Sequence, residues 1–434
     1  MKKIFFAFLL LSIFCCSLFS QHSLNPVHAK DWFKLDPLTD SIAGIGLYKA
    51  NSLLQNRKSV PVIVAVIDNG VDIEHDALKD HIWTNSKEIP GNGIDDDHNG
   101  YIDDMHGWNF RGAKDGTIIE NEQAGATQVF VAWKNKKVNE IYRKAKTIYL
   151  DKLNNSKDSN DIKYAYNVSY HSSRLIANDN GQPGNHLYGS PLVKLSVNLS
   201  HGTHVAGIIA SVDTNVLIMP VVASTAVGDE RDKDVANAIH YAADNGAQII
   251  NISFSKTFSA NKEVVEEAIH YAERKNVLIV HCAGNDGVNN DSTVNYHYPI
   301  GIYNNGKRAN NFITVGWNRP LFDYRLAHPY GDYGKVNVDL YAPGSDIWST
   351  VPGNGYDFKS GSSMSAPVAS GAAALLLSYF PSLTAVQIKE ILIASVFKPD
   401  QMVNKPQTKT PVPFNSLSVS GGILNVYNAV KTIR

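Results

Sequence analysis

Residues 216–254 read VLIMPVVASTAVGDERDKDVANAIHYAADNGAQIINISF, and this stretch decides the expected fold. Two apolar runs rich in β-branched residues, 216–223 and 248–254, have the composition and length of strands buried on both faces. Between them, 234–245 has the apolar spacing of an amphipathic helix and is closed by Gly246. A strand, a helix and a second strand in this order predict a parallel pair joined by a right-handed crossover.

The same alternation continues along the chain. An amphipathic helix is expected over 262–275 and a buried strand over 277–282, with further strands over 312–317 and 336–341. We therefore predict an α/β fold of three layers, in which helices cover both faces of a mostly parallel central sheet. The carboxyl ends of the strands then share one edge, where open α/β sheets place their functional sites.

A further apolar run over 60–68, VPVIVAVID, is followed by Asn69 and Gly70. It predicts another doubly buried strand, with the Asp68 carboxylate at the functional edge of the sheet. By itself, Asp-Asn-Gly is also a common turn sequence, so its role depends on which partners lie nearby.

Residues 361–367 read GSSMSAP and lead into the apolar run VASGAAALLLSYF. The pattern predicts a long helix with Ser363 at its amino end and Pro367 in its first turn. Unpaired N–H groups and the positive end of the helix dipole favour a serine that attacks a carbonyl, because negative charge develops beside them. A helix start capped by small residues explains the same letters equally well.

His201 and Asn285 supply two further candidate groups. His201 opens the small-residue helix HGTHVAGIIAS, and an imidazole can accept and return a proton near neutral pH. Asn285 lies in a glycine turn after the 277–282 strand, where its amide either donates to an oxyanion or only holds the turn. His204 is expected in the core, although His201 and His204 together leave a metallopeptidase as an alternative.

The order of these residues along the chain narrows the chemistry. A nucleophile-elbow hydrolase needs a histidine after its serine, and no histidine follows Ser363. The order Asp68, His201, Ser363 is that of subtilisin-type proteases. VIDNGVD, HGTHVAGIIA, CAGNDG and GSSMSAP resemble the four motifs of the subtilase family of serine peptidases, and the resemblance extends from about residue 32 to the end of the chain.

The resemblance implies a subtilisin-like α/β/α peptidase domain over 60–434 and a role for each motif residue. Asp68 is expected to orient His201, and His201 to take the proton of Ser363. Asn285 and the backbone N–H of Ser363 are expected to bind the oxyanion.

The resemblance also implies that an extended peptide substrate adds to two backbone edges as a strand. One edge contains Val222, and the other contains Ser253, Phe254 and Ser255. Ser255 stands where the family usually has a glycine, so a narrowed primary pocket is expected.

An acidic loop over 92–106, NGIDDDHNGYIDDMH, separates Asp68 from His201. Oxygen ligands recur around Gly100 at the spacing of a calcium loop, although its last position holds His106 rather than glutamate. A structural calcium ion would relieve the repulsion between the carboxylates, and a solvated acidic loop is the alternative. No cofactor is expected for catalysis itself. The expected ligands are Asp95, Asp97, Asn99, Tyr101 and Asp103.

The acidic loop is part of an expected insertion over 83–198. Within it, 129–153 is expected to be helical, with Val138, Ile141, Ala145 and Ile148 on one face. At the amino end, two lysines and an apolar run predict a signal peptide over 1–20, followed by a lead-in over 21–59. Only Cys282 remains after the signal, so no internal disulfide is expected.

Charge and composition narrow the range of partners. The 434 residues include 40 lysines and arginines and 41 aspartates and glutamates, a formal net charge of −1. This balance gives no indication that the protein binds nucleic acid or an anionic membrane. We expect an exported monomer, secreted or periplasmic, without a membrane span after signal removal. It is expected to cleave peptide bonds in extended or unfolded protein segments through an acyl-enzyme. A catalytically idle peptide-binding protein on the same scaffold is the alternative.

Overall fold

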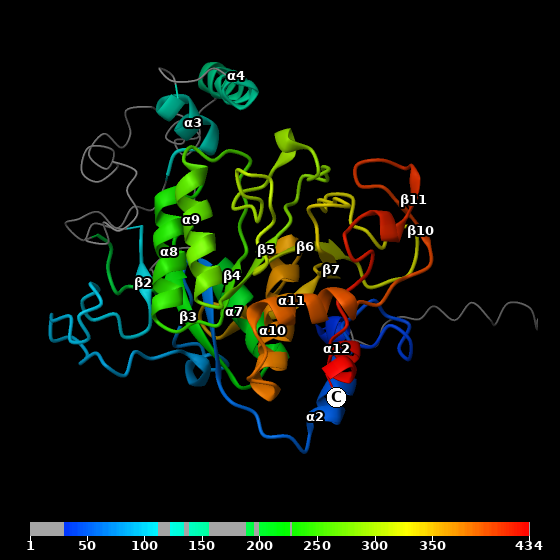
Figure 1. Ribbon diagram of the computed structural model, residues 1–434, viewed down its shortest axis with the longest axis horizontal. Coiled ribbons are helices and arrows are strands. Elements are labelled where there is room, and N and C mark those ends of the chain that lie inside the picture. Colours follow the sequence, from blue (N-terminus) through cyan, green and yellow to red (C-terminus); the bar gives the residue numbers. More distant parts are fainter. Residues whose placement is uncertain are drawn as a thin grey trace, which may run out of the picture.

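The centre of the protein is a seven-stranded sheet in the order β2-β3-β1-β4-β5-β6-β7, and every pairing in it is parallel. The computed structural model describes residues 30–111, 122–133, 139–155, 188–194, 199–225 and 228–433, so the expected signal peptide lies outside it. The predicted parallel α/β architecture is confirmed (Figure 1). The strands are β1 (Val62–Asp68), β2 (Trp108–Asn109), β3 (Val216–Val222), β4 (Ile249–Ile252), β5 (Leu278–Cys282), β6 (Phe312–Asn318) and β7 (Leu340–Pro343).

Helices cover both faces of this sheet, which gives the predicted three layers (Figure 1). Strand β1 shows why both faces are apolar: Val64 and Val66 point into one hydrophobic cluster, whereas Ala65 and Ile67 point into the other. One cluster is built with α2 (Leu47–Leu54), α7 (Ser200–Val212), α10 (Ser362–Tyr379), α11 (Ala385–Ala394) and α12 (Val426–Ile433). The other is built with α8 (Asp232–Asp244) and α9 (Lys262–Arg274).

The lead-in does not stand apart from the peptidase domain. Trp32 and Phe33, in a short 3-10 helix (Trp32–Lys34), belong to the hydrophobic cluster that contains Val64 and Val66 of β1. The indole of Trp32 donates to the carbonyl oxygen of Ser345 at 3.1 Å. Further along, the Val426 N–H donates to the carbonyl oxygen of Ile45 at 2.9 Å. The described part of 21–59 is therefore an integral piece of the core.

The insertion contains two helices where one was expected. Helix α3 (Gly125–Trp133) ends before α4 (Glu140–Asn155) begins, so the expectation of one helical segment over 129–153 is wrong. The two helices pack together through Phe130 and Tyr149, whose rings stack with 4.5 Å between centroids. The predicted apolar face is real for Ile141, Ala145 and Ile148, which pack in one cluster with α3; Val138 lies outside the described residues. In Figure 1 the pair stands above the end of α9.

The observed bounds of other elements differ from the predicted bounds by a few residues. The strand expected over 336–341 begins only at Leu340, and Val336 is exposed. The insertion also contributes β2, which pairs with β3 and extends the sheet by one strand. The remaining short elements are β8 (Ile347–Val351) paired antiparallel with β9 (Gly355–Lys359), β10 (Met402–Asn404) paired antiparallel with β11 (Pro411–Pro413), and 3-10 turns at Lys79–His81, Thr293–Asn295 and Phe414–Ser416.

Candidate active site

Asp68 and His201 meet at the carboxyl edge of the sheet. Asp68 is the last residue of β1, and His201 is the second residue of α7. The imidazole Nδ1 lies 2.9 Å and 3.0 Å from the two carboxylate oxygens, which fixes the ring and leaves Nε2 facing away from Asp68. Asn69 supports this contact, because its side-chain oxygen accepts the N–H of Gly202 at 3.0 Å and ties α7 to the end of β1.

The charge of Asp68 sets the basicity of His201. Burial favours the neutral imidazole, but the carboxylate of Asp68 outweighs this effect and raises the pKa of His201 above its ordinary value. The Asp68 side chain itself is almost fully buried, whereas about a third of the His201 side chain is exposed. The imidazole is thus a stronger base than a free histidine and is accessible from the solvent side.

Ser363 lies beside the end of β4, the strand next to β1. Its hydroxyl donates to the carbonyl oxygen of Ser253 at 2.7 Å, and the hydroxyl of Ser253 donates to the carbonyl oxygen of Ser363 at 2.9 Å. Within the described chain, the Ser363 hydroxyl is therefore bonded to Ser253 and not to His201.

The contact from Ser253 also explains how α10 tolerates its proline. Helix α10 begins at Ser362, so Pro367 is the sixth helical residue and the expectation of a first-turn proline is wrong. A proline at this place leaves the carbonyl four residues earlier, that of Ser363, without its helical donor. The Ser253 hydroxyl fills the missing position. The motif serine is thereby fixed through its own backbone.

Asn285 stands at the amino end of α10. Its side-chain oxygen accepts the N–H of Ser362 at 2.9 Å and the hydroxyl of Ser362 at 3.1 Å, which leaves the amide nitrogen as the outward donor. Asn285 itself is exposed. Gly361, the residue just before α10, has a positive φ of 147°, and a Cβ on it would lie 3.3 Å from the side-chain oxygen of Asn285. The turn therefore needs glycine to bring this amide next to Ser363.

His204 is a core residue, as expected. It is fully buried, its Nε2 lies 3.1 Å from the carbonyl oxygen of Asp357, and burial lowers its pKa to about 4. His201 points its Nδ1 at Asp68 instead. The geometry thus gives no support to a metal held jointly by His201 and His204.

These groups are found in a chain that matches a family model over most of its length. Residues 60–416 match the model described as the subtilase family. The chain belongs to the subtilase family. The relatives include a thermophilic serine proteinase of Bacillus sp. (strain AK1), 38% identical over 41% of this chain and 43% of the relative. Subtilisin-like protease 1 of Plasmodium vivax is 27% identical over 79% of this chain and 44% of the relative.

The match therefore spans less than half of the length of these curated relatives. Among solved structures, a lanthipeptide protease aligns with a TM-score of 0.54 over 94% of this chain and 95% of that one, at 19% identity. At that identity the likeness speaks for the fold alone. The predicted fold of this subtilase is borne out by it.

A buried carboxyl near the site of this subtilase was missed from the sequence. Glu230 is 6% exposed, and the hydroxyl of Ser224 donates to it at 2.7 Å, while the Ser224 N–H donates to the carbonyl oxygen of Asp68 at 3.2 Å. Burial and neighbouring Asp229 raise the pKa of Glu230 to about 7. Nothing in the local letters GDERD distinguishes this glutamate from a solvated one.

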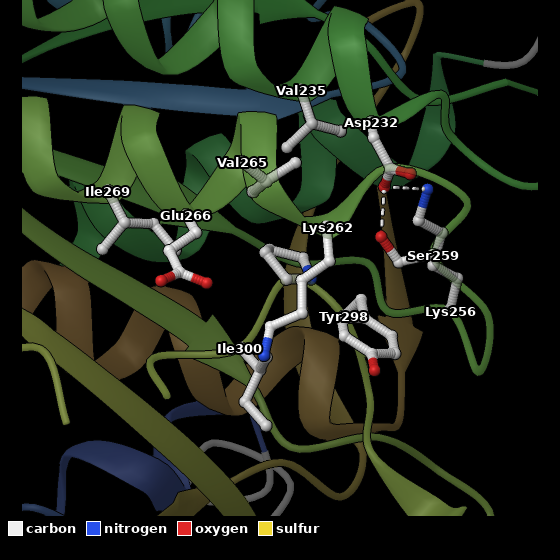
Figure 2. Close-up of a pocket in the computed structure, with 11 residues that line it drawn as sticks. Asp232, Val235, Lys256, Ser259, Lys262, Val265, Glu266, Ile269, Tyr298 and Ile300 are labelled. Atoms are coloured by element: carbon white, nitrogen blue, oxygen red, sulfur yellow. Dashed lines mark hydrogen bonds and ion pairs between the residues drawn. The ribbon is translucent and has the colours of Figure 1, made fainter. Parts of the chain in front are cut away.

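Lys256, whose charge acts on Glu230, is paired with another carboxylate. The Lys256 ammonium lies 2.8 Å from Asp232 and also contacts the backbone carbonyl of Glu230. Figure 2 shows Lys256 and Ser259 converging on the Asp232 carboxylate. The side chain of Glu230 is therefore left without a cation of its own among these neighbours.

The two expected substrate edges differ in the structure. Val222 is fully buried, and its carbonyl oxygen accepts the Phe110 N–H of the segment after β2 at 2.8 Å. Since β2 was not expected, the assignment of Val222 to a substrate edge is corrected: its backbone is already paired. Strand β4 ends at Ile252, so Ser253 and Phe254 follow it and do not lie inside the strand expected over 248–254. The hydroxyl of Ser255 lies 3.2 Å from Nδ1 of His297.

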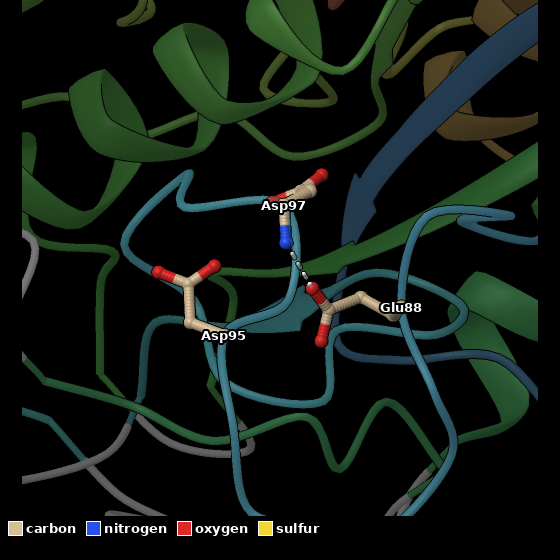
Figure 3. A group of neighbouring side chains, drawn as sticks. All are labelled: Glu88, Asp95 and Asp97. Carbon is tan, nitrogen blue, oxygen red and sulfur yellow. Dashed lines mark hydrogen bonds between the residues drawn. The ribbon is translucent and has the colours of Figure 1, made fainter.

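The acidic loop brings together three carboxylates, one of which was not among the five ligands predicted from the sequence. Asp95, Asp97 and Glu88 place one ligand oxygen each within 4.8 Å of one another (Figure 3). Glu88 was missed, because it lies outside the loop, seven residues before Asp95, the first expected ligand. Its carboxylate accepts the N–H groups of Asp97 at 3.1 Å and of Asp103 at 3.0 Å, so it folds the loop around itself.

The side chains of the other expected ligands have different partners. Asp103 accepts the N–H groups of Asn92 and Gly93, Asn99 accepts the N–H of Tyr101, and the Tyr101 ring packs edge-on against Trp108 in the core, which leaves Tyr101 only its backbone oxygen as a ligand. The five-residue ligand set stays a prediction. Three mutually close oxygens fit part of a calcium shell, whose ligand oxygens stand about 2.3–2.6 Å from the ion and number six to eight.

Proposed function

We propose that this subtilase is a serine endopeptidase that hydrolyses peptide bonds through Asp68, His201 and Ser363. The observation that carries the proposal is the contact of Asp68 with Nδ1 of His201, because it joins residues 133 positions apart and frees Nε2 for proton transfer. Two further observations support the proposal: Ser363 lies beside the end of the adjacent strand β4, and a serine proteinase is among the relatives.

The first chemical step requires a small movement. The Ser363 hydroxyl leaves the Ser253 carbonyl, turns to Nε2 of His201, gives up its proton and attacks the scissile carbonyl. Catalytic hydrogen bonds are often unformed in enzymes without substrate, so the present contact with Ser253 is compatible with this route. Asp68 then stabilises the imidazolium through the two contacts to Nδ1.

The developing oxyanion has two donors in this proposal. The Asn285 amide nitrogen is directed outward by the two bonds to its oxygen, and the Ser363 N–H lies in the first turn of α10, where an N–H group has no acceptor within the helix. Both donors act where the positive end of the helix dipole favours negative charge. Collapse of the intermediate transfers the His201 proton to the leaving amine, and water then hydrolyses the acyl-enzyme.

The substrate class follows from the backbone around Ser253–Ser255. An extended or unfolded protein segment can lie along these residues as an added strand, whereas a folded region cannot. We further propose export, supported by the composition of residues 1–20 and by a relative named cell wall-associated protease. Among the described residues, no helix is both long and apolar enough to cross a membrane. A monomer is proposed, without nucleic-acid partners.

For the acidic loop we propose a structural calcium ion held by Glu88, Asp95 and Asp97, with backbone and water oxygens completing its shell. Its charge would offset the repulsion between the three carboxylates. Chelation should lower the temperature of unfolding, and calcium should restore it. A Glu88→Gln variant should show a smaller response, and an unchanged melting curve with chelator would refute the site.

Covalent labelling tests the enzymatic proposal. A fluorophosphonate should modify Ser363 in the purified protein, and Ser363→Ala should be unlabelled and inactive on unfolded casein. Ser362→Ala, which changes the neighbouring hydroxyl, serves as the matched variant and should still be labelled. If the native protein is folded, unlabelled and inactive, the alternative of an idle peptide-binding protein takes its place.

A further inference from the structure

A solvent-open pocket with a volume of about 360 Å³ is lined by Asn285 and Ser255 among other residues. Asn285 is the proposed oxyanion donor, so the scissile carbonyl would lie at the mouth of this pocket. The side chain of the residue that supplies this carbonyl is then the group that enters it. This inference rests on the proposed function, because it takes the carbonyl position from Asn285.

The insertion forms one wall of the pocket. Ala126 of α3 and Ile148 of α4 line it, together with Phe258 from the segment after β4. The two helices are fixed there, since the indole of Trp133 donates to the carbonyl oxygen of Ala260 at 2.9 Å and the Lys144 ammonium to that of Val294 at 2.9 Å. The insertion therefore determines which side chain fits.

Two carboxylates, those of Asp229 and Asp286, belong to the lining of the pocket. Asp229 lines the pocket wall, where the N–H of Gly125 at the start of α3 donates to one of its carboxylate oxygens at 2.6 Å. Burial raises the pKa of Asp229, so a cation beside it would be stabilising. Asp286 adds a second carboxylate, and its side chain is 62% exposed.

Two basic side chains, those of Lys256 and His297, also line the pocket, and each contacts a carboxylate. The Lys256 ammonium lies 2.8 Å from Asp232, and its charge partly offsets the rise in pKa that burial gives to Asp229. His297 is shared between Asp332 at 3.0 Å and Asp286 at 3.4 Å.

We propose that this pocket selects a lysine or arginine side chain on the amino side of the scissile bond, with Asp229 and Asp286 as the acidic partners and α3 and α4 as the apolar wall. The aliphatic part of such a side chain packs against Ala126, Ile148 and Phe258, and its charged end reaches the carboxylates.

Peptides that differ only in this residue test the proposal. Fluorogenic amide substrates would carry lysine, arginine, or their neutral isosteres norleucine and citrulline. We expect kcat/KM to be about 10- to 100-fold higher for each cation than for its isostere, the range for a hydrogen bond to a charged group. Asp229→Asn, whose oxygen can still accept the Gly125 N–H, should reduce this ratio at least tenfold while leaving norleucine cleavage within about threefold.

Asp286→Asn is the second variant, because its exposed side chain carries little risk to folding; it should reduce the ratio by a smaller factor. Equal or better cleavage of the neutral isosteres by the native protein would overturn the pocket assignment, as would an unchanged ratio in both variants. These outcomes leave fluorophosphonate labelling of Ser363 intact. Failure of that labelling, with no substrate cleaved, would instead overturn the proposed function and this inference with it.

Discussion

Replacing Glu230 with glutamine should stabilise the protein at alkaline pH and not at acidic pH. The pKa of Glu230 is raised from 4.5 to about 7 by burial, so the folded state holds a proton that the unfolded state releases between these values. The free energy of unfolding therefore falls as the pH rises through this window. A shift of this size corresponds to about 3 kcal/mol at 1.36 kcal/mol for each pKa unit.

Glutamine removes this dependence because it stays neutral. Its side-chain oxygen can still accept the Ser224 hydroxyl, so the hydrogen bond at 2.7 Å is retained. We expect Glu230→Gln to match the parent at pH 4.5 and to exceed its free energy of unfolding by up to about 3 kcal/mol at pH 8. Urea unfolding followed by tryptophan fluorescence measures this, with Ser363→Ala present in both proteins to prevent self-digestion.

An exposed glutamate provides the control. Glu390→Gln should change the two free energies of unfolding by less than about 0.5 kcal/mol, as is usual for a surface substitution. The reasoning is refuted if Glu230→Gln has the same effect at pH 4.5 and pH 8.

Other consequences can be measured separately. Asn285→Ala should lower kcat about 10²- to 10³-fold with little change in KM, the loss known for the corresponding donor in subtilisin; an unchanged kcat would contradict its oxyanion role. Gly202→Ala should cost about 10²-fold in kcat, because its Cβ would lie 2.2 Å from the carbonyl oxygen of Gly70 and displace His201. Gly207→Ala, equally crowded but further along α7, should lower thermal stability more than kcat. Cys282 is buried and its pKa is raised to about 12, so iodoacetamide at pH 8 should alkylate it only after unfolding, and mass spectrometry would detect modification of the folded protein.

Much of the site was predictable because the relevant residues end strands. Asp68 and Asn285 follow apolar runs whose β-branched residues predict burial on both faces, and parallel strands bring their carboxyl ends to one edge. His201 and Ser363 open helices that return to this edge. Nothing further was needed to expect that the four residues lie near one another.

Side-chain direction was not predictable in the same way. The acidic loop has calcium-loop spacing, yet Asp103 and Asn99 bind backbone groups and Glu88 joins Asp95 and Asp97 from outside the motif. Spacing gives the order of ligands along a chain, whereas the turns decide which oxygens converge. Val222 was misjudged for a related reason, because β2 pairs with β3 from a segment without a strand pattern.

The sequence by itself determined the parallel sheet, its functional edge and the four motif residues, because periodicity and order are local properties of the chain. Only the tertiary structure decided that Ser253 supplies the donor that Pro367 removes, and that Glu230 is buried beside the site. It alone decided that α3 and α4 line the pocket at Asn285. These features depend on contacts between segments distant in sequence, and burial, charge and cavity shape arise only where such segments pack.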